Sequence, residues 1–151
     1  MPGKKREVII VLVVLALDQL SKFILNANLA LNEPIPLVKG VFSLTLIHNR
    51  GAAFGIFKNQ LYIFIFISVI AIALIYPMFK NNKSGKLYSL SLSLILAGTL
   101  GNFLDRVFLG YVIDFLDFHI WPVFNVADSA ITCGTLILGW LIFKPSKRHA
   151  S

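Results

Sequence analysis

The sequence predicts an α-helical membrane protein with four transmembrane helices and a small extracytoplasmic segment that contains β-structure. Hydrophobic residues make up 57% of the chain and charged residues 14%, whereas soluble domains contain about 45–50% and about 25%, respectively. A helix needs about 20 mainly apolar residues to cross the hydrocarbon core, and a helix satisfies its own backbone hydrogen bonds in lipid. Four stretches meet this requirement, at 8–25, 61–79, 87–104 and 126–143. We expect residues 1–151 to form one membrane-embedded domain.

The first apolar stretch invites a second interpretation as a cleavable signal peptide, because Lys4, Lys5 and Arg6 precede it. Signal peptides end in a small-residue cleavage site that follows a short apolar region. Here the apolar run continues through Asp18 to Leu25, and no such site follows it. We therefore expect the first helix to be retained.

The distribution of basic residues predicts the orientation of the chain. The net charge is +7, and three basic clusters flank the apolar stretches, at 4–6, 80–86 and 144–148. Because basic flanks favour the cytoplasmic side, we expect both termini to be cytoplasmic and segments 26–60 and 105–125 to lie outside. No basic stripe interleaved with aromatic residues occurs elsewhere, so we expect no nucleic-acid partner.

Both outer segments are expected to lie against membrane lipids of the outer leaflet. Pro34 and Pro36 exclude a helix in the first segment. The stretch 41–47, which is rich in β-branched and aromatic residues, predicts a strand there. The second segment contains aromatic residues of the kind found at the headgroup level: Phe108, Tyr111, Phe115, Phe118 and Trp121.

Polar side chains gather at the outer ends of the predicted spans. An ionisable residue at the centre of a span costs about 2.5–3.5 kcal/mol on insertion scales, so such residues suggest function by default. The polar residues of interest here are Asp18, Ser21, Lys22, Asn102, Asp105, Arg106, Asp114, Asp117, Asn125 and Asp128. Spacings of three and four residues place Asp18 and Lys22 on one helix face, and Asn125 and Asp128 on another.

One interpretation of these residues is structural. Asp18 would pair with Lys22, and Asp105 with Arg106 or another base. Asp128 would cap the fourth helix near its N-terminus, where a carboxylate is favoured. This interpretation accounts less easily for Asp114.

The functional interpretation is that two carboxylates converge in a site shielded from water. Two neighbouring carboxylates cannot both ionise easily, so they share one proton and can supply a general base and a general acid together. We expect no metal and no cofactor, because His48, His119 and His149 lack ligand spacing. Cys133 is the only cysteine, so it cannot form an internal disulfide.

Five blocks of sequence carry a resemblance to a known family. They are Asp18-Gln-Leu-Ser-Lys22, His48-Asn-Arg-Gly-Ala-Ala-Phe-Gly55, Ala97-Gly-Thr-Leu-Gly-Asn-Phe-Leu-Asp-Arg106, Tyr111-Val-Ile-Asp-Phe115 and Phe124-Asn-Val-Ala-Asp128. In this order, on a four-span chain of this size, the blocks resemble those of bacterial lipoprotein signal peptidase, or signal peptidase II. The third block often starts with two glycines, and the first is Ala97 here.

The resemblance implies an aspartic endopeptidase of the bacterial inner membrane with an active site near the outer face. It implies that Asp114 and Asp128 are catalytic, and that the substrate is a prolipoprotein cut before a diacylglyceryl-modified cysteine. Asp117 lies outside the matching motif. The residues expected to bind substrate or support the dyad are Asn49, Gly51, Asn102, Arg106, Asn125 and Ala127. Asp18, Lys22 and Asp105 are expected to be structural.

The remaining expectations concern how these residues act together. The asparagines would grip a substrate backbone or orient a carboxylate, and Arg106 would fix Asp105 or a nearby carbonyl. The loop 51–55 and the stretch 105–117 would clamp the scissile bond, and we expect a monomer. A transporter would instead need charges through the whole bilayer depth, and a scaffold would need no carboxylate pair.

Overall fold

The four predicted membrane helices are present in the computed structural model, which describes residues 2–51, 60–80 and 85–144. Each is long and apolar enough to cross a membrane. The helices are α1 (Pro2–Asn28), α2 (Leu61–Lys80), α3 (Lys86–Phe108) and α4 (Val126–Phe143). They contain the four predicted spans. α3 extends to Phe108, so 105–108 is helix rather than outer segment.

The central helix of the bundle is α3, which packs against α1, α2 and α4. Small residues allow α3 and α4 to approach closely, as is common between membrane helices. A Cβ atom built on Gly98 would collide with the backbone carbonyl of Ala127, and one on Gly134 would lie 2.7 Å from the carbonyl oxygen of Ser91. The outer faces of the helices expose large apolar side chains, such as Leu12 and Phe23 of α1, which suits contact with lipid.

A three-stranded antiparallel sheet lies at one end of the bundle, with strand order β1-β2-β3. The strands are β1 (Pro34–Val38), β2 (Phe42–Asn49) and β3 (Val112–Asp117). The predicted strand at 41–47 is confirmed as β2, whereas β1 and β3 were not predicted. An edge strand tolerates the two prolines of β1 because its outer N–H groups need no partner strand.

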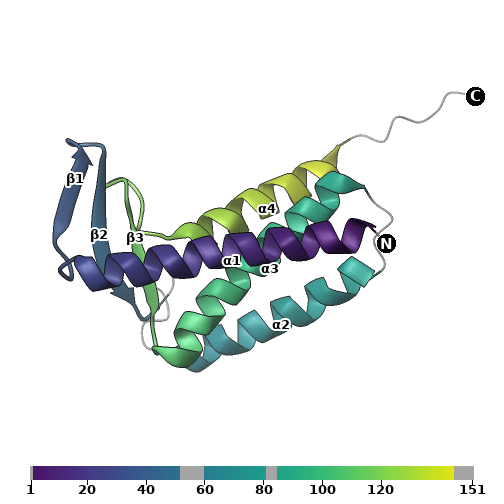
Figure 1. Cartoon of the computed structure of the whole chain (residues 1–151), viewed down its shortest axis with the longest axis horizontal. Helices are drawn as coiled ribbons and strands as arrows, with labels where there is room; N and C mark the ends of the chain where they lie inside the picture. The colour runs from purple at the N-terminus through teal and green to yellow at the C-terminus, as the bar shows by residue number, and fades with distance from the viewer. Residues whose placement is uncertain (1, 52–59, 81–84, 145–151) are drawn as a thin grey trace, which may run out of the picture.

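The sheet and the helices form one continuous structure. Figure 1 shows the sheet at the end of the bundle opposite the start of α1 and the end of α4. Leu46, Ile113 and Phe115 form a buried cluster, against which Leu25 and Leu29 pack from the end of α1 and the residue that follows it. Phe115 therefore belongs to the core, which corrects its expected place among the headgroup aromatics. This packing fixes β3, which carries Asp114, onto the helices.

Candidate active site

Asp114 lies in the middle of β3, where both faces of the strand are buried. Its side chain is 2% exposed. Oδ2 accepts a hydrogen bond of 2.8 Å from Nδ2 of Asn49 at the end of β2, and Oδ1 accepts one of 2.7 Å from Nδ2 of Asn125. The antiparallel pairing of β2 with β3 sets Asn49 opposite Val112, two residues from Asp114. The strand pairing thus brings the amide of Asn49 to the carboxylate.

Asp128 lies in the first turn of α4. Asn125 is the N-cap, its side chain accepts from the backbone N–H of Asp128, and Asp128 Oδ2 accepts from the backbone N–H of Asn125. The expected capping role of Asp128 is therefore confirmed. Its second oxygen, Oδ1, accepts a hydrogen bond of 2.7 Å from Nδ2 of Asn102 on α3. The carboxylate caps the helix with one oxygen while the other is held by a neighbouring helix.

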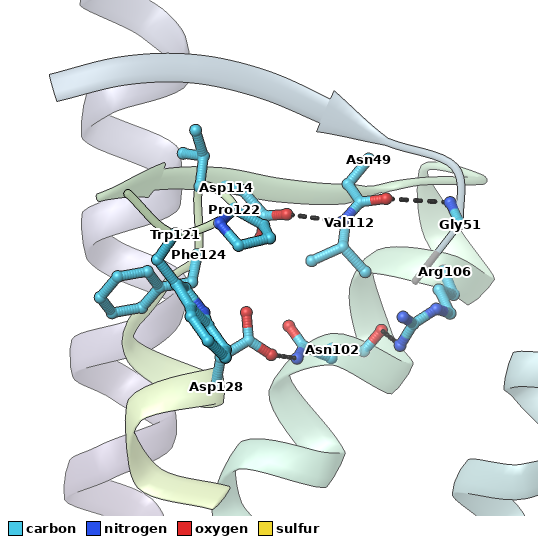
Figure 2. A pocket seen from close by; sticks show the side chains of 11 residues that line it. Asn49, Gly51, Asn102, Arg106, Val112, Asp114, Trp121, Pro122, Phe124 and Asp128 are labelled. Atoms are coloured by element: carbon cyan, nitrogen blue, oxygen red, sulfur yellow. Dashed lines mark hydrogen bonds between the residues drawn. The ribbon is translucent and has the colours of Figure 1, made fainter. Parts of the chain in front are cut away.

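A cavity of about 290 Å³ brings the two carboxylates together. Figure 2 shows Asp114 on the sheet side of the cavity and Asp128 on the helix side, both directed into it. Asn49, Gly51, Asn102 and Arg106 also line the cavity, as expected for residues that support or bind there. Asn125 and Ala127 lie outside the lining. They are fully buried behind it.

Two asparagines connect the two carboxylates. Nδ2 of Asn125 donates to Asp114 Oδ1 and lies 3.1 Å from Oδ1 of Asn102, whose own Nδ2 donates to Asp128. Asn125 is completely buried, and its Nδ2 also approaches the carbonyl oxygen of Ile113. Because each amide is held on several sides, the carboxylates keep a defined orientation without a substrate. The expectation that asparagines orient a carboxylate fits these contacts.

The environment of Asp114 favours its protonated form. Burial, followed by the nearby charge of Asp128, raises the pKa of its carboxyl, which stands at about 7 instead of 3.8. The hydrogen bonds from Asn49 and Asn125 and the charge of Lys22 act in the opposite direction. A carboxyl group that takes up or releases a proton near neutral pH is suited to acid–base chemistry.

Arg106 lies at the edge of the cavity and does not pair with Asp105. Its Nη1 donates to the backbone carbonyl of Asn102 at 3.4 Å, and its guanidinium lies 4.9 Å from the centre of the Phe64 ring. The expected contact with a nearby carbonyl is therefore confirmed. The backbone N–H of Gly51 donates to Oδ1 of Asn49. Residues 52–55 of the expected clamp lie outside the described residues.

Asp18, Lys22 and Asp105 form a buried group outside the lining of the cavity. Lys22 Nζ lies 2.8 Å from a carboxylate oxygen of each aspartate. The expected pair of Asp18 with Lys22 is confirmed, and the partner of Asp105 is Lys22. Ala127 packs here too, with its backbone N–H donating to Asp18 at 2.8 Å.

The sequence interpretation missed one wall of the cavity. Trp121, Pro122, Val123 and Phe124 line it between β3 and α4, and Val112 lines it from β3. The signal was present, because Phe124 opens the block that ends at Asp128, and Trp121 is an aromatic residue close to both aspartates in sequence. Trp121 was instead interpreted as a headgroup residue. In the described part of the chain, no three His, Cys, Asp or Glu side chains are grouped to hold a metal ion.

His48 fixes the end of β2 beside Asn49. Its ring stacks on Tyr111 with ring centres 4.0 Å apart, and its Nε2 lies 3.0 Å from Oδ1 of Asn26 on α1. Burial lowers the pKa of the imidazole, and the charge of Arg50 lowers it further. A neutral His48 therefore links β2 to α1 and to the start of β3, which steadies the strand end that presents Asn49.

Nearly the whole chain resembles proteins of one known family. The family model of signal peptidase (SPase) II matches residues 10–144. The chain belongs to the signal peptidase II family. Lipoprotein signal peptidases are among its relatives: that of Halothermothrix orenii is 42% identical over 139 residues, covering 92% of this chain and 96% of the relative. That of Caldanaerobacter subterraneus subsp. tengcongensis is 48% identical over 140 residues, covering 91% and 96%.

The fold of this chain is similar to that of a solved membrane-protein structure. A bacterial membrane enzyme determined by the in meso method at 2.3 Å matches with a TM-score of 0.89 at 28% identity, covering 97% of this chain and 94% of the other. Membership of the family makes the protein a signal peptidase. The four apolar helices fit a multi-pass protein of the bacterial inner membrane.

Proposed function

We propose that this protein is an aspartic endopeptidase that removes signal peptides from prolipoproteins by cutting before the diacylglyceryl-modified cysteine. The observation that carries the proposal is the placement of Asp114 and Asp128 in one cavity, each held by an asparagine amide. The lipoprotein signal peptidases among its relatives support the choice of substrate.

The chemistry follows from one proton shared by two carboxyl groups. The ionised aspartate accepts a proton from a water molecule while the water oxygen attacks the carbonyl carbon of the scissile peptide bond. The other aspartate gives its proton to the departing amide nitrogen, and the C–N bond breaks. After the bond breaks, the pair still holds one proton, the one taken from the water, and the starting state returns when this proton passes from the base to the acid. Burial keeps one proton on the pair near neutral pH, because two charges in this cavity would repel each other.

The position of the cavity suits a substrate that is anchored in lipid. The cavity lies where the sheet meets the ends of α3 and α4. With both termini in the cytoplasm, as we propose, these ends lie near the outer face of the membrane. Trp121 is 60% exposed and lines the cavity, so an apolar surface borders the carboxylates. A cysteine that carries two acyl chains would stay at this depth while the peptide enters the cavity.

The competing functions explain fewer of these observations. A transporter needs polar groups through the bilayer, whereas the buried charged residues among the described ones are Asp18, Lys22, Asp105 and Asp114. These lie at or near the sheet end of the bundle, together with Asp128. A scaffold gains nothing from holding a buried and a partly buried carboxylate at one cavity, because burying a charge is costly.

Cleavage of a diacylglyceryl-modified prolipoprotein in detergent tests the proposal. The wild type, Asp114→Asn and Asp128→Asn are compared, because asparagine keeps the shape but cannot exchange the carboxyl proton. We expect the wild type to cut before the modified cysteine and both variants to fold without cutting. Asp117→Asn is the matched control, because this aspartate bonds to Thr45 and His119 outside the cavity. Wild-type turnover in either dyad variant would refute the dyad.

A further inference from the structure

We propose that Asp18, Lys22 and Asp105 form a positioning cluster that sets the placement of the two candidate catalytic aspartates relative to each other. The cluster joins α1 to α3 and has a backbone contact beside each aspartate of the dyad. This inference rests on the proposed function, because it takes Asp114 and Asp128 as the groups that do the chemistry. It assigns the cluster more than the expected structural role.

Lys22 is the centre of the cluster. Its side chain is 2% exposed, and an ammonium group has three hydrogen-bond donors. Three acceptors surround it: Oδ2 of Asp18 at 2.8 Å, Oδ2 of Asp105 at 2.8 Å and Oδ1 of Asn102 at 3.0 Å. Lys22 donates hydrogen bonds to Asp18 and Asn102 and forms an ion pair with Asp105, so one ammonium group holds all three side chains.

The two carboxylates extend the cluster to the backbone beside the dyad. Oδ1 of Asp18 accepts from the N–H of Ala127 at 2.8 Å, and Ala127 directly precedes Asp128. Oδ2 of Asp105 accepts from the N–H of Ile113 at 3.2 Å, and Ile113 directly precedes Asp114. Each carboxylate thus holds the residue before one dyad aspartate, and Lys22 holds both carboxylates.

Lys22 also acts on Asp128 through Asn102. Its donation to Oδ1 of Asn102 leaves the Nδ2 group of that amide directed at Asp128, which it reaches at 2.7 Å. A flipped amide would set its NH₂ group against the ammonium group. The charge of Lys22 therefore selects the amide orientation that supplies a donor to the carboxylate.

Charge neutralisation alone does not require this arrangement. A single aspartate would balance Lys22, whereas burying a second carboxylate adds a desolvation cost. Gln19 supports both, because its Nε2 lies 3.1 Å from Asp18 Oδ2 and 3.0 Å from Asp105 Oδ1. What the second carboxylate adds is the contact with the backbone of β3. The geometry therefore points to positioning.

Asp105→Asn tests the inference, with Asp117→Asn as the matched control. Both changes remove one carboxylate near the sheet, but the described contacts of the Asp117 side chain are with Thr45 and His119. A misplacement of about 1 Å can cost about 100-fold in rate, so we expect kcat of Asp105→Asn to fall about 10- to 100-fold. We expect KM to stay within about threefold, and kcat of the control to stay within about twofold.

Coupling between variants separates a cluster from independent contacts. If Lys22 and Asp105 act as one unit, the double variant Lys22→Met with Asp105→Asn should have nearly the same kcat as the single variant Lys22→Met. Losses that multiply would overturn the cluster. Folding is measured for each variant by size-exclusion chromatography and thermal unfolding. Where Asp105→Asn does not fold, Asp18→Asn takes its place with the same expectation.

The outcomes distinguish this inference from the proposed function. If the wild type does not cut, or if a dyad variant still cuts, the proposed function fails and this inference fails with it. If the dyad assignment stands but folded Asp105→Asn keeps wild-type kcat, the positioning cluster alone is refuted. If neither Asp105→Asn nor Asp18→Asn folds, the residues serve folding only, and the inference is again refuted.

Discussion

Replacing Asp114 with asparagine should make the protein more stable at alkaline pH and change its stability little at acidic pH. The pKa of Asp114 rises from 3.8 to about 7, mainly through burial. Between these two values the folded protein holds a proton that the unfolded chain has released. Stability must therefore fall as the pH rises through this window.

The magnitude follows from the size of that pKa change. One pKa unit corresponds to 1.36 kcal/mol, so the raised pKa of Asp114 lowers the free energy of unfolding by about 4 kcal/mol above pH 7. At pH 5 it lowers it by about 1–2 kcal/mol, because the unfolded chain has released a proton that the folded protein keeps. Asparagine avoids this cost but loses about 1 kcal/mol, because its NH₂ group meets a donor from Asn49 or Asn125. The net gain is close to zero at pH 5 and about 3 kcal/mol at pH 8.

Thermal unfolding in detergent at pH 5 and pH 8, followed by tryptophan fluorescence, measures this difference. For a chain of this length, about 3 kcal/mol corresponds to about 6–12 °C in Tm. Asp117→Asn is the control: partial burial acts to raise the pKa of Asp117, but hydrogen bonds from Thr45 and His119 lower it overall. That variant should gain no stability at pH 8. Equal Tm differences for Asp114→Asn at both pH values would refute the reasoning.

Three further predictions follow from the site and the packing. The kcat of the wild type should fall above about pH 7, because Asp114 then loses the shared proton; a flat pH–rate profile to pH 9 would contradict this. A chelator should leave cleavage unchanged, which an assay with and without EDTA checks, and loss of activity that Zn²⁺ restores would contradict it. Gly98→Ala should lower the free energy of unfolding by about 1–3 kcal/mol because its Cβ would meet the carbonyl of Ala127. Gly139→Ala, with nothing within 4 Å of its Cβ, should not destabilise; equal Tm values for the two variants would contradict the packing argument.

The helices could be predicted from the sequence because the membrane imposes a length and a composition on each one. The sheet could be predicted only in part. β2 carries enough β-branched and aromatic residues to be recognised, whereas β1 is interrupted by Pro34 and Pro36. β3 is buried on both faces over its first four residues, so it lacks the alternation that marks a half-buried strand.

The candidate site shows the same division. Spacing within one helix predicted the pair of Asp18 with Lys22, and the position of Asp128 at the start of α4 predicted its cap. The contact of Lys22 with Asp105 joins residues on different helices, so no local pattern indicates it. The wall formed by Trp121 and Phe124 was missed because an aromatic residue near a membrane fits both an interface and a cavity.

The small sheet explains how a helical protein can hold two carboxylates face to face. Asp128 needs only the start of α4 and the side chain of Asn102. A second aspartate at the start of α4 would lie on the same side of the cavity as Asp128. Asp114 faces Asp128 from the opposite side (Figure 2). β3 provides this second side, because pairing with β2 brings Asn49 to Asp114 and packing of Ile113 and Phe115 fixes the strand on the bundle. The sheet therefore holds in place a buried carboxyl group that costs stability above neutral pH.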